Sequence, residues 1–236
     1  MKLSIIIPVF NEEKTINKVL ERVSALKIPA VDIQIIVVDD GSTDGTVEKI
    51  KQAKNKKVKF LAHEKNAGKG AAVRTGIENA AGDYIVIQDA DLEYNPQDLK
   101  VLVDEVVSKR AEVVYGTRLK RMPNLSRDER TPQFLLHYLG NRSLSFLTSI
   151  LYGQWITDME TGYKLFPKNA MKKIRLNARG FELEPEITAK ILKNGYKIKE
   201  VSITTNPRGY DEGKKLNTVR DGAKALLTLI KYRFTD

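Results

Sequence analysis

The sequence of 236 residues has no cysteine, one tryptophan and two histidines. The lack of cysteine excludes disulfides, thiolate nucleophiles and cysteine-ligated metals. No apolar run approaches the roughly 18 residues that span a bilayer. The first apolar stretch is short, is interrupted by Pro8 and lacks a small-residue cleavage site, so it does not have the pattern of a signal peptide. These absences favour a cytoplasmic chain with an ordinary packed core.

Positive charge is abundant and unevenly placed. The net charge is +10, and the segment from Lys164 onward holds 17 lysines and arginines against 8 acidic residues, a balance of +9. Such a segment can attract anionic lipid or phosphorylated substrates, or it can be a solvated basic face. Neither an aromatic RNA-binding motif nor a zinc-finger spacing accompanies the charge, so nucleic acid is not an expected partner.

The first half of the chain alternates short apolar segments with helical patterns. The predicted strands are residues 3–10, 33–40, 58–64, 83–91 and 111–118. This alternation predicts an α/β fold with a mostly parallel sheet flanked by helices. Ligands of such sheets bind beyond the carboxyl ends of the strands. We therefore expect the functional residues at one edge of the sheet.

The second half is less regular. Residues 119–133 are basic and turn-forming, and residues 134–156 predict either one long interrupted helix or two amphipathic helices. A helix started by Pro185 and stopped by Gly195, a strand over 198–208 and an amphipathic helix over 219–234 complete the pattern. The sequence thus predicts an extension of amphipathic helices at the C-terminal side.

The segment "IVIQDADLEYNP" carries the strongest chemical signal. Asp89 and Asp91 are two residues apart at the end of an apolar strand, so they share an orientation, and Glu93 follows. Mg²⁺ or Mn²⁺ bridging these carboxylates and a diphosphate would relieve their repulsion. The alternative is a cap for the next helix, but Asn95 and Pro96 already supply that start. We predict a metal site at Asp89, Asp91 and Glu93.

Two further motifs allow two interpretations each. In "VVDDGSTDGT", Asp39 and Asp40 end a strand, where a carboxylate can bind a base N–H or ribose hydroxyls, or can cap the following helix. In "NAGKGAAVRTG", the glycines can cradle a phosphate, or Gly68 and Gly70 can permit close packing of helix and strand.

Basic residues offer charge for a phosphate. The candidates are Arg118, Arg208, Lys214 and Lys215, although each alone could be ordinary surface charge. The last three lie in "NPRGYDEGKKL", a glycine-containing basic run that follows a strand. This composition is typical of a loop that closes a cationic clamp over a diphosphate.

The order and spacing of these motifs resemble a known family. "IIIPVFNEE", "VVDDGSTDGT", "NAGKGAAVRTG", "QDADLEYNP" and "GTR" are similar to the motifs of family 2 glycosyltransferases with the Rossmann-like GT-A fold. The later "DMETGYKLF", "GFELEPEITAK" and "EVSITTNPRGYDEGKKL" resemble the group of dolichyl-phosphate mannose synthases and polyprenyl-phosphate glucosyltransferases. The resemblance covers about residues 2 to 233. It implies a single catalytic domain, residues 1–236, with a nucleotide-sugar-binding half (1–118) and an acceptor-side half (119–236).

The resemblance also implies roles for individual residues. Those implied to contact the nucleotide sugar are Pro8, Phe10, Glu12, Val38, Asp40, Asp89, Ala90, Asp91, Arg118, Arg208 and Lys214. Asp89, Ala90 and Asp91 match the DxD element, which binds the donor through Mg²⁺ or Mn²⁺. Glu93 stands where mannose synthases often carry Gln or Ser, and "YDEGKK" replaces their "GxSK" pattern. The donor sugar therefore stays open between a GDP-mannose and a UDP-glucose type.

The implied reaction is inverting transfer of a hexose to a polyprenyl phosphate. Asp91 would act at the metal, and Arg118, Arg208 and Lys214 would stabilise the leaving diphosphate. A lipid phosphate is already anionic and needs no general base. An alternative is a soluble transferase acting on a sugar hydroxyl, with Asp158 or Glu160 as the base. A third possibility is a non-catalytic nucleotide-sugar sensor.

The sequence also predicts contact with a membrane. The aromatic and leucine-rich segment Phe134–Ile156 could lie among lipid headgroups, with Arg127, Arg130 and Arg142 near anionic phosphates, or it could only cover the sheet. Many family members carry C-terminal transmembrane helices, which this sequence does not show. We expect a peripheral protein at the cytoplasmic face of the membrane, held there by amphipathic helices or by a small membrane-anchoring partner.

Overall fold

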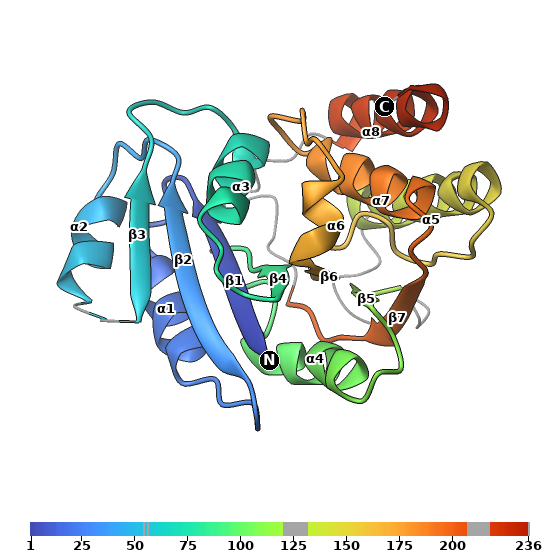
Figure 1. The fold of residues 1–236 in the computed structure, drawn as a ribbon. Helices are drawn as coiled ribbons and strands as arrows, with labels where there is room; N and C mark the ends of the chain where they lie inside the picture. Colours follow the sequence, from blue (N-terminus) through green and yellow to red (C-terminus); the bar gives the residue numbers. More distant parts are fainter. Residues whose placement is uncertain (54, 56, 120–131, 207–217, 236) are drawn as a thin grey trace.

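A computed structural model describes residues 1–53, 55, 57–119, 132–206 and 218–235. Its centre is a seven-stranded sheet with the order β3-β2-β1-β4-β6-β5-β7 (Figure 1). The strands are β1 (Lys2–Val9), β2 (Asp32–Asp39), β3 (Val58–Ala62), β4 (Tyr84–Ile87), β5 (Val113–Thr117), β6 (Lys164–Pro167) and β7 (Ile198–Ser202). All neighbouring pairs are parallel except those of β6, which runs antiparallel to β4 and to β5. The predicted α/β class with a mostly parallel sheet is confirmed.

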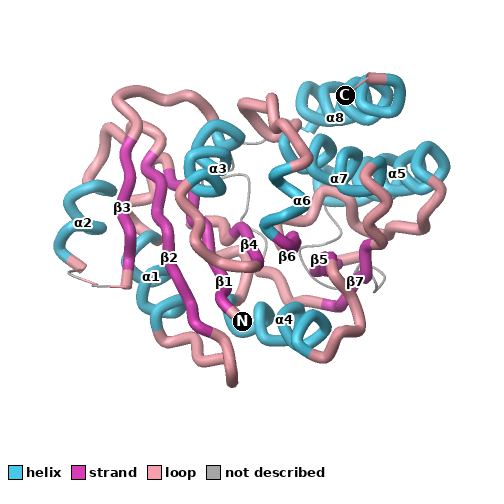
Figure 2. The backbone as a smooth tube through the Cα atoms, in the orientation of Figure 1, coloured by secondary structure: helices cyan, strands magenta, loops and turns pink. Residues whose placement is uncertain are grey.

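Helices cover both faces of the sheet (Figures 1 and 2). The helices are α1 (Ile16–Ser24), α2 (Thr46–Gln52), α3 (Lys69–Glu78), α4 (Leu99–Val107), α5 (Pro132–Tyr152), α6 (Lys168–Lys172), α7 (Leu183–Lys193) and α8 (Thr218–Phe234), with a 3₁₀ turn η1 (Pro96–Asp98) before α4. Helices α1, α2 and α4 share one hydrophobic cluster with one face of the sheet. Helices α3 and α5 to α8 share the other cluster. Alternate residues of β1 enter opposite clusters, Ile5 and Ile7 on one side and Ile6 on the other, as the pleat requires.

The five strands predicted for the first half are present, although β4 ends at Ile87, four residues before its predicted end. Two features of the second half also differ in detail. Helix α5 is one continuous helix through Gly140, where an added Cβ would meet no atom within 4 Å. Helix α8 packs against α5 and α7, so the amphipathic helices form one group beside the sheet. Strand β6 was not predicted. It is four residues long and begins with a lysine, so it lacks the continuous apolar pattern of a buried strand.

Candidate functional site

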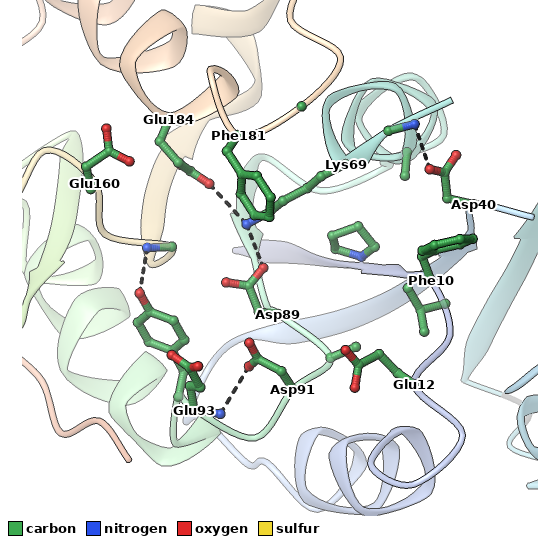
Figure 3. Close-up of a pocket in the computed structure, with 18 of the residues that line it drawn as sticks. Phe10, Glu12, Asp40, Lys69, Asp89, Asp91, Glu93, Glu160, Phe181 and Glu184 are labelled. Atoms are coloured by element: carbon green, nitrogen blue, oxygen red, sulfur yellow. Dashed lines mark hydrogen bonds and ion pairs between the residues drawn. The ribbon is translucent and has the colours of Figure 1, made fainter. Parts of the chain in front are cut away.

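A cavity of about 480 Å³ opens at the carboxyl ends of β1, β2 and β4 and reaches the first turn of α7 (Figure 3). Most predicted donor residues line it: Pro8, Phe10, Glu12, Asp40, Asp89, Ala90, Asp91, Glu93 and Arg118. The arrangement follows from the parallel strands, because their carboxyl ends meet at one edge of the sheet. The wall opposite this edge includes Glu160, Phe181 and Glu184, which come from the second half of the chain.

Asp40 organises the loop before α3. One of its carboxylate oxygens accepts the N–H of Gly68 at 2.7 Å, and the other accepts the N–H of Ala67 at 3.0 Å. His63 places its Nδ1 2.7 Å from the same carboxylate and its Nε2 2.9 Å from the Thr75 hydroxyl. Because a carboxylate only accepts, His63 donates from Nδ1. Asp40 thus holds the glycine loop in place, and a contact between Asp40 and a base stays a prediction.

Gly68 and Gly70 bring this loop against the chain that precedes α7. A Cβ at Gly68 would lie 2.1 Å from the carbonyl oxygen of Arg179, and one at Gly70 would lie 2.2 Å from that of Ala178. The N–H of Gly70 donates to the Arg179 carbonyl at 2.8 Å. Gly68 also has φ +95°, which side chains rarely adopt. Of the two interpretations of this motif, the geometry supports close packing, with segment 178–179 as the partner.

Asp39 closes a local turn and does not cap the next helix, because the N-cap residue of α2 is Gly45. Its Oδ2 accepts the N–H of Ser42 at 3.1 Å, which closes the turn after β2. Its side chain is buried beside Val38, and neither residue lines the cavity. A nucleotide contact by Val38 therefore stays a prediction and would have to involve its backbone or a neighbouring residue.

Asp89 is held by a cation from the glycine loop. The ammonium of Lys69, the first residue of α3, lies 2.7 Å from Asp89 Oδ1 and 3.2 Å from Glu184 Oε1 (Figure 3). Burial works against the charge of Lys69, but attraction to Asp89 and Glu184 outweighs it and raises the lysine pKa. The other Asp89 oxygen faces Gly162, where a Cβ would lie 2.6 Å from Oδ2. Asp89 therefore has a fixed orientation between a lysine and a glycine.

Asp91 and Glu93 lie in a tight turn after β4. The N–H of Glu93 donates to Asp91 Oδ1 at 3.1 Å, and Leu92 between them has φ +65°. The Glu93 carbonyl accepts the N–H of Asn206 at 2.8 Å, and Tyr94 pairs with Thr205 in an antiparallel bridge. The chain therefore enters the basic segment that contains Arg208 and Lys214 from a position beside the acidic turn.

Arg118 and Asp158 form a buried forked ion pair. Arg118 donates from Nε and from a terminal nitrogen to the two Asp158 oxygens, each at 2.8 Å, and its backbone N–H adds a third bond at 2.9 Å. Burial alone would raise the Asp158 pKa, but Arg118 lowers it below the usual value. The pairing leaves Asp158 behind Arg118, outside the cavity lining. It acts on the cavity through the position of Arg118, and a role as a base stays a prediction.

Glu160 has a different environment. It lines the cavity, and its Oε1 is buried without a hydrogen bond among the described residues. Burial raises its pKa to about 7, although Lys164 opposes the shift. A carboxyl group with this pKa can exchange a proton near neutral pH. Glu160 is thus better placed than Asp158 to handle a proton.

The structure also brings in residues that sequence reasoning did not single out. Lys69, Tyr94, Phe181 and Glu184 line the cavity. In the sequence, only one kind of signal could have pointed to such residues, namely a charged residue within an apolar pattern. Lys164 and Glu184 sit inside apolar patterns, and the structure pairs them at 2.7 Å with both side chains buried. Arg208 and Lys214 lie outside the described residues.

The acidic turn presents oxygen donors of the kind that a divalent ion would use. Asp89 and Asp91 present hard oxygen donors to the same cavity, which matches the preference of Mg²⁺ and Mn²⁺. Within the described residues, no group of three or more His, Asp or Glu side chains is arranged to hold a metal. Mg²⁺ commonly uses one or two carboxylates and takes its other ligands from phosphate and water. The third ligand, Glu93, stays a prediction.

An exposed apolar face lies on α5 and α8, which pack against each other. We call it the α5–α8 face, and its residues are Leu136, Leu139, Phe146, Ile150, Leu226, Leu227, Ile230 and Phe234, together with Trp155 in the loop after α5. Trp155 and Phe234 are 66% and 79% exposed. A small cleft between the two helices shares His137, Glu160 and Phe181 with the main cavity. No helix in the described part of the chain is both long and apolar enough to cross a membrane.

Known proteins similar in sequence to this chain include two that are named as glycosyltransferases. The chain is 32% identical to the UDP-N-acetylglucosamine–dolichyl-phosphate N-acetylglucosaminyltransferase of Methanococcus voltae, over 91% of this chain and 90% of that protein. It is 28% identical to the dolichol-phosphate mannosyltransferase of Pyrococcus furiosus, over 98% of this chain but 64% of that protein.

A solved structure has the same fold. The glucosyl-3-phosphoglycerate synthase of Mycobacterium tuberculosis, in complex with Mn²⁺, UDP and phosphoglyceric acid, superposes with a TM-score of 0.75 at 20% identity, over 100% of this chain and 79% of that one. The profile of glycosyl transferase family 2 matches residues 4–175. The chain is therefore a glycosyltransferase and belongs to glycosyl transferase family 2.

Proposed function

We propose that the protein transfers one hexose from a nucleotide diphosphate sugar to a polyprenyl phosphate, with inversion at the anomeric carbon. The observation that carries this proposal is that the acidic cavity and the cleft between α5 and α8 share His137, Glu160 and Phe181, while the same two helices carry the α5–α8 face. A polar donor and an apolar acceptor could therefore meet at one place. Relatives that are named for transfer to dolichyl phosphate support the acceptor class.

The donor would lie along the strand ends. Phe10, Glu12 and the loop held by Asp40 would contact the nucleotide, with Pro8 and Ala90 shaping that wall and Val38 supporting it from the core. Asp89 and Asp91, with Glu93 as a further candidate ligand, would hold Mg²⁺ or Mn²⁺, whose chemistry when bound is Lewis-acid stabilisation of the leaving diphosphate. UDP and Mn²⁺ in the structure of similar fold support this class of donor and ion.

Arg118 would stabilise negative charge as the diphosphate departs. Its guanidinium borders the cavity, and its pKa is raised because attraction to Asp158 outweighs burial, so it stays charged. A fixed, partly buried cation stabilises developing charge without reorganisation at the moment of reaction. Arg208 and Lys214 would add charge from the segment that begins beside Glu93.

The acceptor half would work at a membrane surface. The α5–α8 face could enter the headgroup layer, with Lys224, Lys231 and Arg233 of α8 near anionic phosphates. We infer a peripheral protein at the cytoplasmic face, within one catalytic domain whose residues 1–118 bind the donor and residues 119–236 the acceptor. A small membrane-anchoring partner could cover part of the same face.

A donor-by-acceptor screen tests the proposal. Purified protein is incubated with UDP-glucose, GDP-mannose or UDP-N-acetylhexosamines, a short polyprenyl phosphate and Mn²⁺, and the glycolipid product is measured. We expect product with at least one donor, and loss of that product with Asp91→Asn. Absence of product with every donor, from folded protein, would sink the proposal.

One observation favours a second candidate, transfer to a sugar hydroxyl. Such an acceptor needs a base, and Glu160 has a pKa of about 7 and lines the cavity. Glu160→Gln and Asp158→Asn separate the two functions. If Glu160→Gln abolishes transfer while donor binding persists, the hydroxyl acceptor is favoured. Persistent transfer to the lipid phosphate in Glu160→Gln supports the first proposal. Nucleotide-sugar binding without turnover on any acceptor would indicate a sensor.

A further inference from the structure

We propose that Lys69 is a built-in counter-ion of Asp89 that makes binding of the divalent ion depend on the nucleotide. This inference rests on the proposed metal-dependent function and deepens it. Lys69 would be a positioning residue: it acts through Asp89, and it keeps the acidic turn neutralised until a diphosphate brings its own negative charge.

The position of Lys69 is determined from several sides. Its ammonium lies 2.7 Å from Asp89 and 3.2 Å from Glu184, and its side chain is 19% exposed (Figure 3). The second Glu184 oxygen is 2.7 Å from the buried Lys164 ammonium, so Glu184 cannot turn away without breaking that pair. The backbone of Lys69 is fixed by the neighbouring Gly68 and Gly70, which contact segment 178–179. The lysine is therefore part of a built arrangement.

Asp89 has little freedom to leave Lys69. Its Oδ2 faces Gly162 so closely that a Cβ there would lie 2.6 Å away, and its Oδ1 is the oxygen that Lys69 contacts. A divalent ion binding at Asp89 and Asp91 would thus lie a few ångströms from an ammonium. Like charges at that separation in a partly desolvated site repel by kilocalories, so the isolated ion is disfavoured.

A diphosphate changes this balance. Its negative charges attract both the divalent ion and the Lys69 ammonium. The two cations can therefore lie in one cavity when the diphosphate is bound. The glycine loop places Lys69 on the wall that would face such a ligand. Metal and donor would therefore bind together, which limits binding of metal to the enzyme without its donor.

The test is Mn²⁺ binding, measured by isothermal titration and by the electron paramagnetic resonance signal of free Mn²⁺. Wild-type protein is compared with Lys69→Met and Lys69→Gln, each without nucleotide and with saturating UDP or GDP. We expect both neutral variants to bind Mn²⁺ about tenfold more tightly without nucleotide, and to gain correspondingly less from it. Lys69→Gln can still donate to Asp89, so it keeps the test open if Lys69→Met does not fold.

Two control variants test whether the positive charge of Lys69 causes the effect. Lys69→Arg keeps the cation and should keep the strong dependence on nucleotide. Lys65→Met removes an exposed lysine of the same loop and should bind Mn²⁺ like the wild type. Equal Mn²⁺ affinity of wild type and neutral variants without nucleotide, with binding promoted by UDP or GDP in all, would overturn the role of Lys69 alone. A wild type that binds no Mn²⁺ even with either nucleotide would overturn the metal-dependent function as well.

Discussion

Two pairs of carboxylates, one pair from each half of the molecule, are stabilised in different ways. In the first half, Asp39 and Asp40 accept backbone N–H groups of nearby loops. In the second half, Asp158 and Glu184 are paired with the charged side chains of Arg118 and Lys164. The loops that follow β2 and precede α3 are thus shaped by hydrogen bonds to carboxylates, while Asp158 and Glu184 are held by ion pairs.

This difference between hydrogen-bonded and ion-paired carboxylates predicts which substitutions should lower the free energy of unfolding most. Removing one partner of a buried pair leaves an uncompensated charge, which costs about 3–5 kcal/mol. Removing a carboxylate that caps N–H groups leaves donors that water can partly satisfy, which costs less. Substitution of Asp39 or Asp40 should therefore cost less stability than removal of one partner from the Lys164–Glu184 pair.

The largest effect is expected for Lys164→Met. The Lys164 ammonium is buried and bonds to Glu184 and to the carbonyls of Met159 and Thr161. We expect the free energy of unfolding to fall by about 3–5 kcal/mol, measured by urea denaturation. The matched control, Lys172→Met, removes an exposed lysine and should change stability by less than about 0.5 kcal/mol. Equal stabilities of the two variants would remove the contrast between the halves.

A smaller loss is expected for Asp40→Ala. The substitution leaves the N–H groups of Ala67 and Gly68 and the His63 ring without their acceptor. The expected loss is about 2 kcal/mol, with weaker binding of the donor because the glycine loop is released. Asp32→Ala, at the exposed start of the same strand, is the control. A loss as large as that of Lys164→Met would show that backbone donors and buried cations stabilise carboxylates equally.

Glu160→Gln should have an effect that depends on pH. The folded pKa of Glu160 is about 7 against an ordinary 4.5, so the folded state binds the proton more tightly than the unfolded state. This contribution to stability is complete below about pH 4.5 and is lost as pH rises through 7. At pH 8 the glutamine variant should be more stable than the wild type by on the order of 2 kcal/mol.

Thermal unfolding at pH 5 and pH 8 checks this sign. Glu182→Gln is the control, because N–H groups of Gly180 and Arg179 outweigh partial burial and lower the Glu182 pKa. Its replacement should leave the change between pH 5 and pH 8 as in the wild type. The same pH dependence in wild type and Glu160→Gln would contradict the burial of Glu160.

The smallest effect on stability is expected on the α5–α8 face. Ile150→Ser with Leu227→Ser changes two side chains that are 63% and 66% exposed, so the free energy of unfolding should stay within about 0.5 kcal/mol. Binding to anionic lipid vesicles, measured by sedimentation, should fall severalfold. Val101→Ser, on the exposed side of α4, should leave vesicle binding unchanged. Unchanged vesicle binding of the double variant would show that the α5–α8 face does not contact the membrane.

Local patterns predicted the strand ends well. The run from Ile85 to Pro96 predicted a strand, an acidic turn and a capped helix start, and Asn95 does accept the N–H of Gln97. These features depend on neighbouring residues, so the sequence alone carries them. The same holds for Gly195, which ends α7 with φ +81°.

Contacts between the halves were not predictable in this way. The pairing of Lys69 with Asp89 and Glu184 joins residues from three distant segments, and no periodic pattern reports such a contact. Strand β6 escaped prediction because it is only four residues long and begins with Lys164, a lysine that is buried through its pairing with the tertiary partner Glu184. Helix α5 was predicted with a break at Gly140, yet a glycine costs a helix only about 1 kcal/mol.

The contact of Gly68 and Gly70 with segment 178–179 has a consequence for protein engineering. Exchanging residues 119–236 for those of a relative is a natural way to combine one donor half with another acceptor half. The exchange would place a foreign backbone against two positions that leave no room for a Cβ. A chimera should therefore fold best when the glycine loop and the segment before α7 are inherited from the same parent.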